Sequence, residues 1–511
     1  TWSALAQAQF SVGPVAQNLK ISEVMYNPGD TGDPEDPNCE YIELTNVGAE
    51  PINLNLVEFT NGVRFTFGDY VLAPGAYTLV VAKQTAFEAR YGTGLPIAGE
   101  YVGRLDNGGE RVTLEDAAGA VIHSFRYRDG WYAITDGLGF SLTVVDPSLA
   151  DAGSLENKSS WRPSALAGGS PGHDDSGIVP PLGAVKINEL LAHSHAEAAD
   201  WIELHNTTGQ AINIGGWFLS DSASNFKKYE IAAGTSIPAN GYIVFYQNLH
   251  FGNAADAGAH ETFAFSENGE TAYLHSGSGG QLTGYVEEES FGASETGVAF
   301  GRYLKSTGTY NFVAMSTNTP GAANAYPKVG PVVINEIMYN PPVNGDAEYV
   351  ELRNITGAPV SLQTWDNQLS VYVPWRLTDD DGITYDFPLN TTIPAGGYLL
   401  VARSLAAFNA SYPGAPGGVQ KLEWVNGRLD NAGEKVELSL PGDVNPNTGN
   451  RYYIRVDRVN YSDGSHPVGE DPWPTGPDGG GQSLTRINSS AYGNDVINWK
   501  GATPSPGAAN P

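Results

Sequence analysis

The sequence contains almost no cysteine and no long apolar run. Cys39 is the only cysteine among 511 residues, so no disulfide bond can form within the chain, and paired-cysteine metal or redox motifs are absent. No stretch of 18 apolar residues occurs, so we expect no insertion into a membrane. Secretion stays compatible with these absences, because domains of ordinary size bury enough apolar surface without disulfide bonds.

Basic residues are also scarce. The chain has 27 lysines and arginines against 57 acidic residues, which gives a formal net charge of −30. A nucleic-acid-binding protein normally presents a basic face, so we expect no nucleic-acid partner. The sequence also lacks the phosphate-binding, serine-hydrolase and zinc-protease signatures that would identify a common enzyme class.

Helical patterns are rare, and turn residues are abundant. The 62 glycines and 33 prolines separate short segments of alternating apolar residues, which is typical of β-strands joined by turns. Only residues 86–92 and 405–414 are expected to form one or two helical turns. The sequence therefore predicts an all-β protein.

One sequence unit occurs three times along the chain. It opens with KISEVMYNP from Lys20, KINELLAHS from Lys186 and VINEIMYNP from Val333. A second run follows in each unit, and these runs are EYIELTN, DWIELHN and EYVELRN. Repeats of about 150 residues are whole domains, because solenoid repeats are much shorter.

Later elements recur in the same order, and each unit ends in a Ser/Thr-Pro-Gly motif, at Ser170, Thr319 and Ser505. We therefore predict three tandem antiparallel β-sandwich domains joined by short Pro/Gly/Ala linkers. The predicted boundaries are an N-terminal extension at 1–19 and domains at 20–175, 183–325 and 331–511.

The ordered motifs resemble the lamin tail domain as it occurs in bacterial secreted proteins. They comprise INE-MYNP, E-Y/W-IEL-N, IPAGGYLLVA, LDN-GE-V-L, GxSL and NW…TPGAAN, and the resemblance covers about residues 20–511. It implies an immunoglobulin-like fold, an extracellular or cell-surface location and no enzymatic activity. Nuclear lamins use their version for protein and DNA contacts, but the charge of −30 gives no support for DNA binding here.

Two glutamates occupy equivalent places in every unit. The first strand carries Glu23, Glu189 or Glu336, and the second carries Glu43, Glu203 or Glu351. Paired carboxylates could catalyse glycoside hydrolysis or bind a cation. We favour a structural role, in which each carboxylate accepts hydrogen bonds and fixes a corner of the fold.

Two loops of the third unit carry oxygen ligands that suit calcium as a cofactor. They contain Asp379 and Asp381, and Asp443, Asn445 and Asn447. Neither loop matches the full EF-hand pattern, and turn chemistry explains the same residues. In the second unit, histidines and acids suggest a zinc site as a further hypothesis: His193, His195, Glu197, Asp200 and His205.

Three functions remain open from the sequence. The favoured one is a non-enzymatic structural or interaction protein of a bacterial cell-surface or filamentous assembly, whose partners are other protein chains and whose residues 1–19 donate a strand to a neighbour. The alternative is a carbohydrate- or calcium-binding accessory region of a larger secreted enzyme, with polysaccharide as partner. The third is a hydrolase that uses the glutamates. The aromatics considered for a sugar-binding surface, or for the core, are Trp131, Trp217, Trp365, Trp375 and Trp473.

Overall fold

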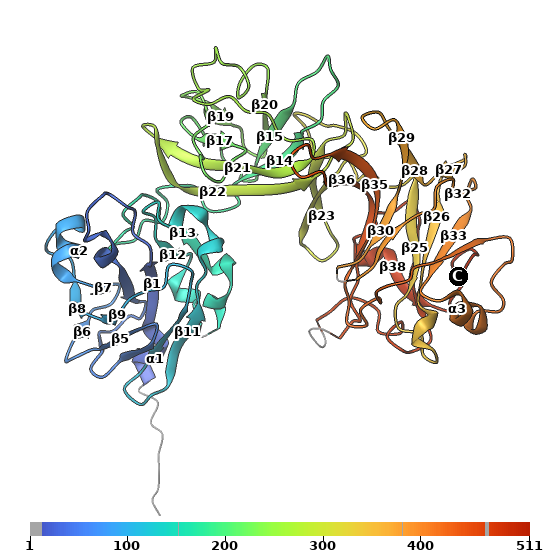
Figure 1. The fold of residues 1–511 in the computed structure, drawn as a ribbon. Helices are drawn as coiled ribbons and strands as arrows, with labels where there is room; N and C mark the ends of the chain where they lie inside the picture. The colour runs from blue at the N-terminus through green and yellow to red at the C-terminus, as the bar shows by residue number, and fades with distance from the viewer. Residues whose placement is uncertain (1–12, 152, 381, 466–469) are drawn as a thin grey trace, which may run out of the picture.

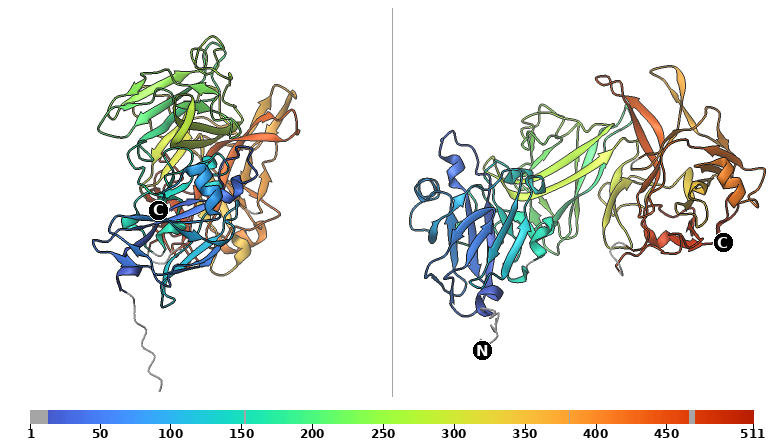
Figure 2. Two further views of the ribbon diagram at one scale, coloured as in Figure 1. Left: turned by 90° about the vertical axis from the view of Figure 1, so that its left-hand side faces the viewer. Right: turned by 60° about the horizontal axis from the view of Figure 1, so that its bottom comes forward.

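A computed structural model describes residues 13–151, 153–380, 382–465 and 470–511. The chain forms three β-sandwiches that follow one another in an arch, with the second in the middle (Figure 1). The right-hand view of Figure 2 shows the same succession of the three sandwiches. The predicted all-β class of immunoglobulin-like sandwiches is confirmed.

The first sandwich packs two main sheets face to face. One sheet has the order β13 (Trp161–Pro163), β12 (Leu142–Val144), β1 (Leu19–Met25), β2 (Tyr41–Asn46), β7 (Tyr77–Val81), β8 (Ile97–Glu100). The other has β11 (Val121–Arg126), β10 (Arg111–Glu115), β4 (Glu58–Asn61), β5 (Val63–Thr66), β9 (Val102–Gly103), and β3 (Ile52–Asn53) pairs with β6 (Val71–Leu72). Helices α1 (Gly13–Asn18) and α2 (Gln84–Tyr91) complete it.

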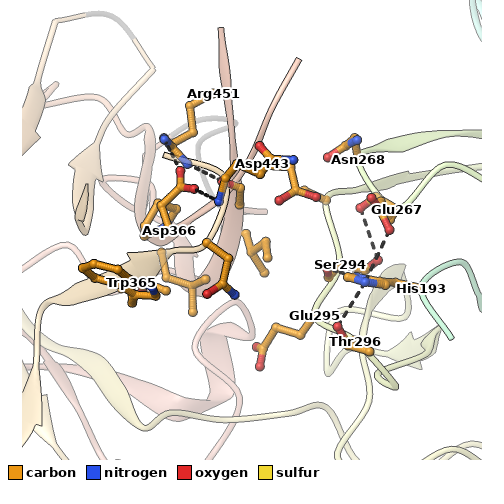
Figure 3. Close-up of a pocket in the computed structure, with 18 residues that line it drawn as sticks. His193, Glu267, Asn268, Ser294, Glu295, Thr296, Trp365, Asp366, Asp443 and Arg451 are labelled. Carbon is orange, nitrogen blue, oxygen red and sulfur yellow. Dashed lines mark hydrogen bonds and ion pairs between the residues drawn. The ribbon is translucent and has the colours of Figure 1, made fainter. Parts of the chain in front are cut away.

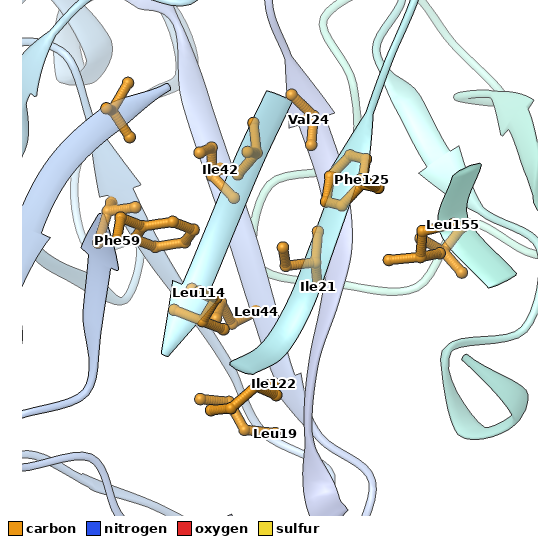
Figure 4. Close-up of a cluster of buried hydrophobic side chains, with 14 of the residues drawn as sticks. Leu19, Ile21, Val24, Ile42, Leu44, Phe59, Leu114, Ile122, Phe125 and Leu155 are labelled. Atoms are coloured by element: carbon orange, nitrogen blue, oxygen red, sulfur yellow. The ribbon is translucent and has the colours of Figure 1, made fainter. Parts of the chain in front are cut away.

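The core of this sandwich lies between the two sheets. Ile21 and Leu44 reach it from one sheet, and Phe59, Leu114 and Phe125 reach it from the other (Figure 4). Inward and outward side chains alternate along each strand, which explains the period-two apolar pattern of the sequence.

The second and third sandwiches repeat this plan. The second has β20 (Tyr242–Tyr246), β15 (Trp201–Asn206), β14 (Val185–Leu191), β23 (Phe300–Leu304), β24 (Tyr310–Ala314) facing β18 (Tyr229–Glu230), β17 (Phe218–Ser220), β21 (Gly269–Ser278), β22 (Gln281–Gly292), with β16 (Ile212–Asn213) beside β19 (Ser236–Ile237). The third has β34 (Gln420–Glu423), β33 (Tyr398–Ala402), β26 (Tyr349–Asn354), β25 (Val332–Met338), β37 (Ser483–Arg486), β38 (Trp499–Ala502) facing β31 (Thr384–Asp386), β30 (Arg376–Thr378), β35 (Lys435–Val444), β36 (Arg451–Asn460). The third also has the pairs β27 (Val360–Ser361) with β32 (Thr392–Ile393) and β28 (Gln363–Asp366) with β29 (Val371–Pro374), and helix α3 (Leu405–Ser411).

Two strand pairs depart from the predicted antiparallel pattern. Strand β8 runs parallel to β7, and β34 runs parallel to β33. The two predicted helical segments explain this, because α2 and α3 carry the chain back along the sheet before the next strand begins. None of the described helices is long and apolar enough to cross a membrane.

Part of the predicted N-terminal extension belongs to the first sandwich. Helix α1 covers residues 13–18, and β1 begins at Leu19. Val15 is 5% exposed and Leu19 is 0% exposed, and both pack in the first core. The remaining residues, 1–12, lie outside the described part of the chain.

The sandwiches meet at specific joints. Between the first two, the Gly284 N–H of β22 donates to Ala165 O at 2.9 Å. Between the last two, Ser306 N–H donates to the Asp495 carboxylate at 3.0 Å, and Tyr492 N–H donates to Tyr326 Oη at 2.8 Å. Directed hydrogen bonds of this kind fix the relative orientation of neighbouring domains better than apolar contact alone.

Candidate functional site: a carboxylate pair in each sandwich

The two repeated glutamates stand directly opposite each other on adjacent strands. The strand registers pair Glu23 with Glu43, Glu189 with Glu203 and Glu336 with Glu351. A bulge precedes the first glutamate of every pair, and it shifts the following residues by one position along the partner strand. All six side chains are at most 1% exposed. The structure therefore brings together the carboxylates that the sequence singled out.

In the first sandwich, hydroxyl and backbone N–H groups surround Glu23. The hydroxyl groups of Tyr41 and Ser141 donate to Oε1, the former at 2.6 Å. Ser170 donates its N–H to Oε1 and its hydroxyl to Oε2, each at 2.9 Å. Buried carboxylates need such donors because removal from water is costly.

The second carboxylate of the pair, Glu43, is held from both sides. The hydroxyl of Ser22 donates to Oε1 at 2.7 Å, and the N–H of Gly172 donates to Oε2. Ser22 comes from the opening motif, whereas Gly172 comes from the closing motif Ser-Pro-Gly. The pair thus ties the last segment of the sandwich to its first strand.

The other sandwiches use the same closing motif. Thr319 N–H and hydroxyl donate to Glu189 at 3.0 and 2.7 Å, and Gly321 N–H donates to Glu203. In the third sandwich, Ser505 N–H donates to Glu336 at 2.9 Å, the Ser483 hydroxyl also donates to Glu336, and Gly507 N–H donates to Glu351. Asparagines Asn188 and Asn335 take the place of Ser22, each at 2.7 Å from the second glutamate. We call each pair with its closing motif a clasp.

Sequence reasoning missed the donors of the clasp. The sequence alone indicates only that the closing motifs end the domains, although the motif [ST]-P-G follows the first glutamate in all three units. That shared order was the signal, since the Ser or Thr meets the first glutamate and the Gly meets the second. Separations of 118 to 169 residues along the chain concealed these contacts.

Burial raises the pKa values of the glutamates in the clasps. Desolvation raises the pKa of Glu351 to about 8 and that of Glu203 to about 7, and the neighbouring carboxylate of each pair adds to the shift. Burial also raises the pKa of Glu23, Glu43 and Glu336, against the hydrogen bonds that favour their charged forms. Two carboxylates directly opposite each other on adjacent strands repel when both are ionised, so a state in which the pair holds one proton is favoured.

This geometry suits a structural role. A hydrolytic pair needs a cleft in which a substrate lies between the two carboxyl groups. Here the carboxylates are buried, and the chain's own serine, threonine and glycine donors occupy them. The clasp closes a loop of more than a hundred residues and satisfies buried polar groups.

The two predicted calcium loops show turn contacts. Asp379 is 9% exposed, and one of its oxygens accepts the N–H groups of Gly382 and Ile383 at 2.8 and 2.7 Å. Asn445 accepts the Asn447 N–H at 2.9 Å, as in an Asx turn. Asp381 lies outside the described residues, and Asp443 lines a cavity discussed below. Calcium binding stays a prediction.

The histidines of the second sandwich make separate local contacts. His193 lies in the loop after β14, where its ring nitrogens contact Ser294 O at 3.1 Å and Thr296 Oγ1 at 3.0 Å. His205 stacks on Tyr242 with ring centroids 4.4 Å apart. Strand β14 ends at Leu191, so His193 and His195 lie in the loop that follows it. In the described part of the chain, no three His, Cys, Asp or Glu side chains are placed to hold a metal ion.

Of the five tryptophans considered for a sugar surface, only Trp365 is strongly exposed, at 47%. Trp131, Trp217 and Trp375 are buried in the cores, and Trp473 packs against the third core. Trp365 borders a cavity of about 440 Å³ between the second and third sandwiches (Figure 3). Polar side chains line this cavity: His193, Glu267, Asn268, Asp366, Asp443 and Arg451.

Comparisons with known proteins agree with the repeat. The family model of the Lamin Tail Domain matches residues 14–129, 179–288 and 326–463. No curated protein matches the chain. Among solved structures, a DUF4876 family protein of Bacteroides thetaiotaomicron is similar at 10% identity, over 42% of this chain and 84% of that chain, with a TM-score of 0.22.

Proposed function

Because the chain belongs to the lamin tail domain family and contains the domain three times, we propose that it is a non-enzymatic structural or interaction protein that acts outside the cell. In this proposal the tandem sandwiches form a stiff spacer or a subunit of a cell-surface or filamentous assembly, with other protein chains as partners. The observation that carries it is the clasp, which commits the six recurring carboxylates to closing the three sandwiches.

The joints support a spacer. Gly284 lies so close to the first sandwich that an added Cβ would stand 1.9 Å from Ser164 O. Tyr303 and Tyr492 pack edge to face across the second joint, with ring centroids 5.3 Å apart. Contacts that exclude even a methyl group resist hinge motion, whereas ordinary domain interfaces permit it.

Two measurements test this function. Small-angle scattering and electron microscopy of the intact chain should give one stiff arrangement of three bodies, and native material should show it within an extracellular assembly. Glycosidase activity that is lost in Glu336→Gln and Glu351→Gln, at unchanged folding, would instead establish a hydrolase. A broad distribution of interdomain distances would refute the spacer.

A second candidate function is carbohydrate binding, because Trp365 is exposed beside a polar cavity. Its cross-strand neighbour Tyr372 is 53% exposed, and the two rings meet at 5.1 Å. Exposed aromatic pairs offer an apolar surface to a sugar ring. Glycan-array binding that Trp365→Ala abolishes would favour this accessory role, and a melting shift on adding calcium after EDTA treatment would support the calcium version.

A further inference from the structure

The second sandwich leaves open a sheet edge that the other two cover. In the first and third, a helix returns the chain so that β8 lies beside β7 and β34 lies beside β33. In the second, the chain turns back after β20, and β20 forms the edge of its five-stranded sheet. Within the described residues, β20 pairs with β15 alone.

The strand registers identify which backbone groups face this open edge. Val244 pairs with Glu203, just as Leu79 of the first sandwich pairs with Glu43. Leu79 N–H donates at 2.9 Å to Pro96 O, on the side away from β2. By this correspondence the N–H and C=O of Val244 point away from β15, toward the open side.

Burial confirms that the edge lacks a cover. Leu79 and Leu400 are both 0% exposed, whereas Val244 is only partly buried. Toward the end of β20, a turn satisfies the next outward group, since Tyr246 N–H bonds His250 Nδ1 at 2.9 Å. The accessible edge therefore centres on Val244.

The edge carries none of the usual protection against strand addition. Its sequence, Tyr-Ile-Val-Phe-Tyr, has no charged residue and no proline. In contrast, the corresponding edge strands of the other sandwiches carry charge, with Glu100 in β8 and Lys421 and Glu423 in β34. An unprotected apolar edge invites another strand.

We propose that residues 1–12 of a second copy add to β20 as a parallel strand. This inference rests on the proposed self-assembly and names its contact. The sequence TWSALAQAQFSV contains no charged residue in a chain of net charge −30, and small or apolar residues alternate from Trp2 to Val12. That pattern suits an added strand that presents one face to an apolar surface. The direction follows from β8 and β34, which run parallel at the equivalent edge.

The proposed contact joins unlike surfaces. The donor segment precedes the first sandwich, and the acceptor edge, β20, lies in the second. A contact between unlike surfaces propagates head to tail and gives open filaments unless its rotation closes a ring. Self-association should therefore continue beyond the dimer as concentration rises.

Sedimentation velocity of the full chain, a Δ1–12 chain and Val244→Pro tests this contact. Proline removes the outward N–H of Val244, which no bond to β15 uses, so the fold should persist. Val244→Thr is the matched control, since it keeps both the N–H and the branched side chain. The full chain and Val244→Thr should associate, whereas Δ1–12 and Val244→Pro should remain monomeric. Circular dichroism checks folding.

A synthetic peptide of residues 1–12 gives the second readout. It should bind the Δ1–12 chain at one site per chain, and Val244→Pro in that chain should weaken binding at least tenfold. Equal binding of the peptide to the Δ1–12 chain with and without Val244→Pro would place the binding site elsewhere. Self-association of the Δ1–12 chain would exclude residues 1–12 as the donor strand. A monomeric full chain that fails to bind the peptide would overturn the inference, while the scattering measurement would decide the spacer role separately.

Discussion

The clasp of the third sandwich should weaken as pH rises, and Glu351 should be the cause. Its pKa lies at about 8 in the closed clasp, against an ordinary value of 4.5. Because the closed state raises this pKa, its stabilising contribution is fully present below the ordinary value. It is lost as pH rises toward about 8. Proton linkage between these two values gives a loss of about 3–4 kcal/mol between pH 5 and pH 8.

Hydrogen exchange at the closing segment measures this loss locally, in the intact chain. The Gly507 N–H donates to Glu351, so its protection reports clasp opening. After correction for the intrinsic pH dependence of exchange, the opening free energy of the wild type should fall steeply from pH 5 to pH 8. Glu351→Gln should make this slope clearly shallower, because glutamine does not titrate and only the raised pKa of Glu336 remains in the clasp.

The substitution Glu351→Gln should also change the absolute protection of the Gly507 N–H, independently of pH. Glutamine places an NH₂ group near Asn335 Nδ2, and this mismatch should cost about 1 kcal/mol at every pH. Only the pH dependence of the opening free energy therefore tests the assignment to Glu351. Glu50→Gln, at an exposed glutamate of the first sandwich, serves as the control and should keep the wild-type slope. A Glu351→Gln chain with an unchanged slope would refute the assignment.

Four further substitutions test the fold and its joints. Gly284→Ala should push the first two sandwiches apart, because the new Cβ would lie 1.9 Å from Ser164 O, and scattering should then show a broader interdomain distribution. Trp375→Ala should cost about 3–5 kcal/mol in denaturant unfolding of the third sandwich, whereas Trp365→Ala should stay within about 0.5 kcal/mol; equal losses would contradict their assigned burial. Ser483→Ala removes a hydroxyl donor from a buried carboxylate and should cost about 1–3 kcal/mol, and an unchanged melting temperature would contradict its role.

The sequence predicts those features of the fold whose signals lie within a few neighbouring residues. Strand alternation, the turn residues and the three openings led to the tandem sandwiches, because these signals lie within a few residues of each other. The parallel strands β8 and β34 were not predicted, since their pairing depends on where α2 and α3 return the chain. The six glutamates were recognised as one recurring position, but their donors were not, because Ser170 and Glu23 are 147 residues apart.

The second sandwich differs from the first both in an aromatic residue of its second strand and in the helix that this residue would contact. Where the first sandwich has Tyr41, whose hydroxyl donates to Glu23, the second has Trp201 at the same register. In the first sandwich, Tyr41 packs against Phe87 of α2, with ring centroids 5.5 Å apart. The second sandwich has no counterpart of α2 within its described residues, and Trp201 is 5% exposed in a cluster with Leu191 and Ala299.

The Trp201 indole packs with Leu191 and Ala299 at the register where Tyr41 packs on α2, so we expect it to cover part of the face that the helix covers in the first sandwich. Within its described residues, the second sandwich lacks both this helix and the returning strand, and β20 forms the edge of its sheet. If the indole compensates for the missing helix, Trp201→Tyr should destabilise the second sandwich by about 1–3 kcal/mol, because the smaller ring leaves a cavity. Phe87→Ala should do the same in the first sandwich, by about 3–5 kcal/mol. A second sandwich that gains stability on Trp201→Tyr would show instead that the indole is not needed to cover the open face.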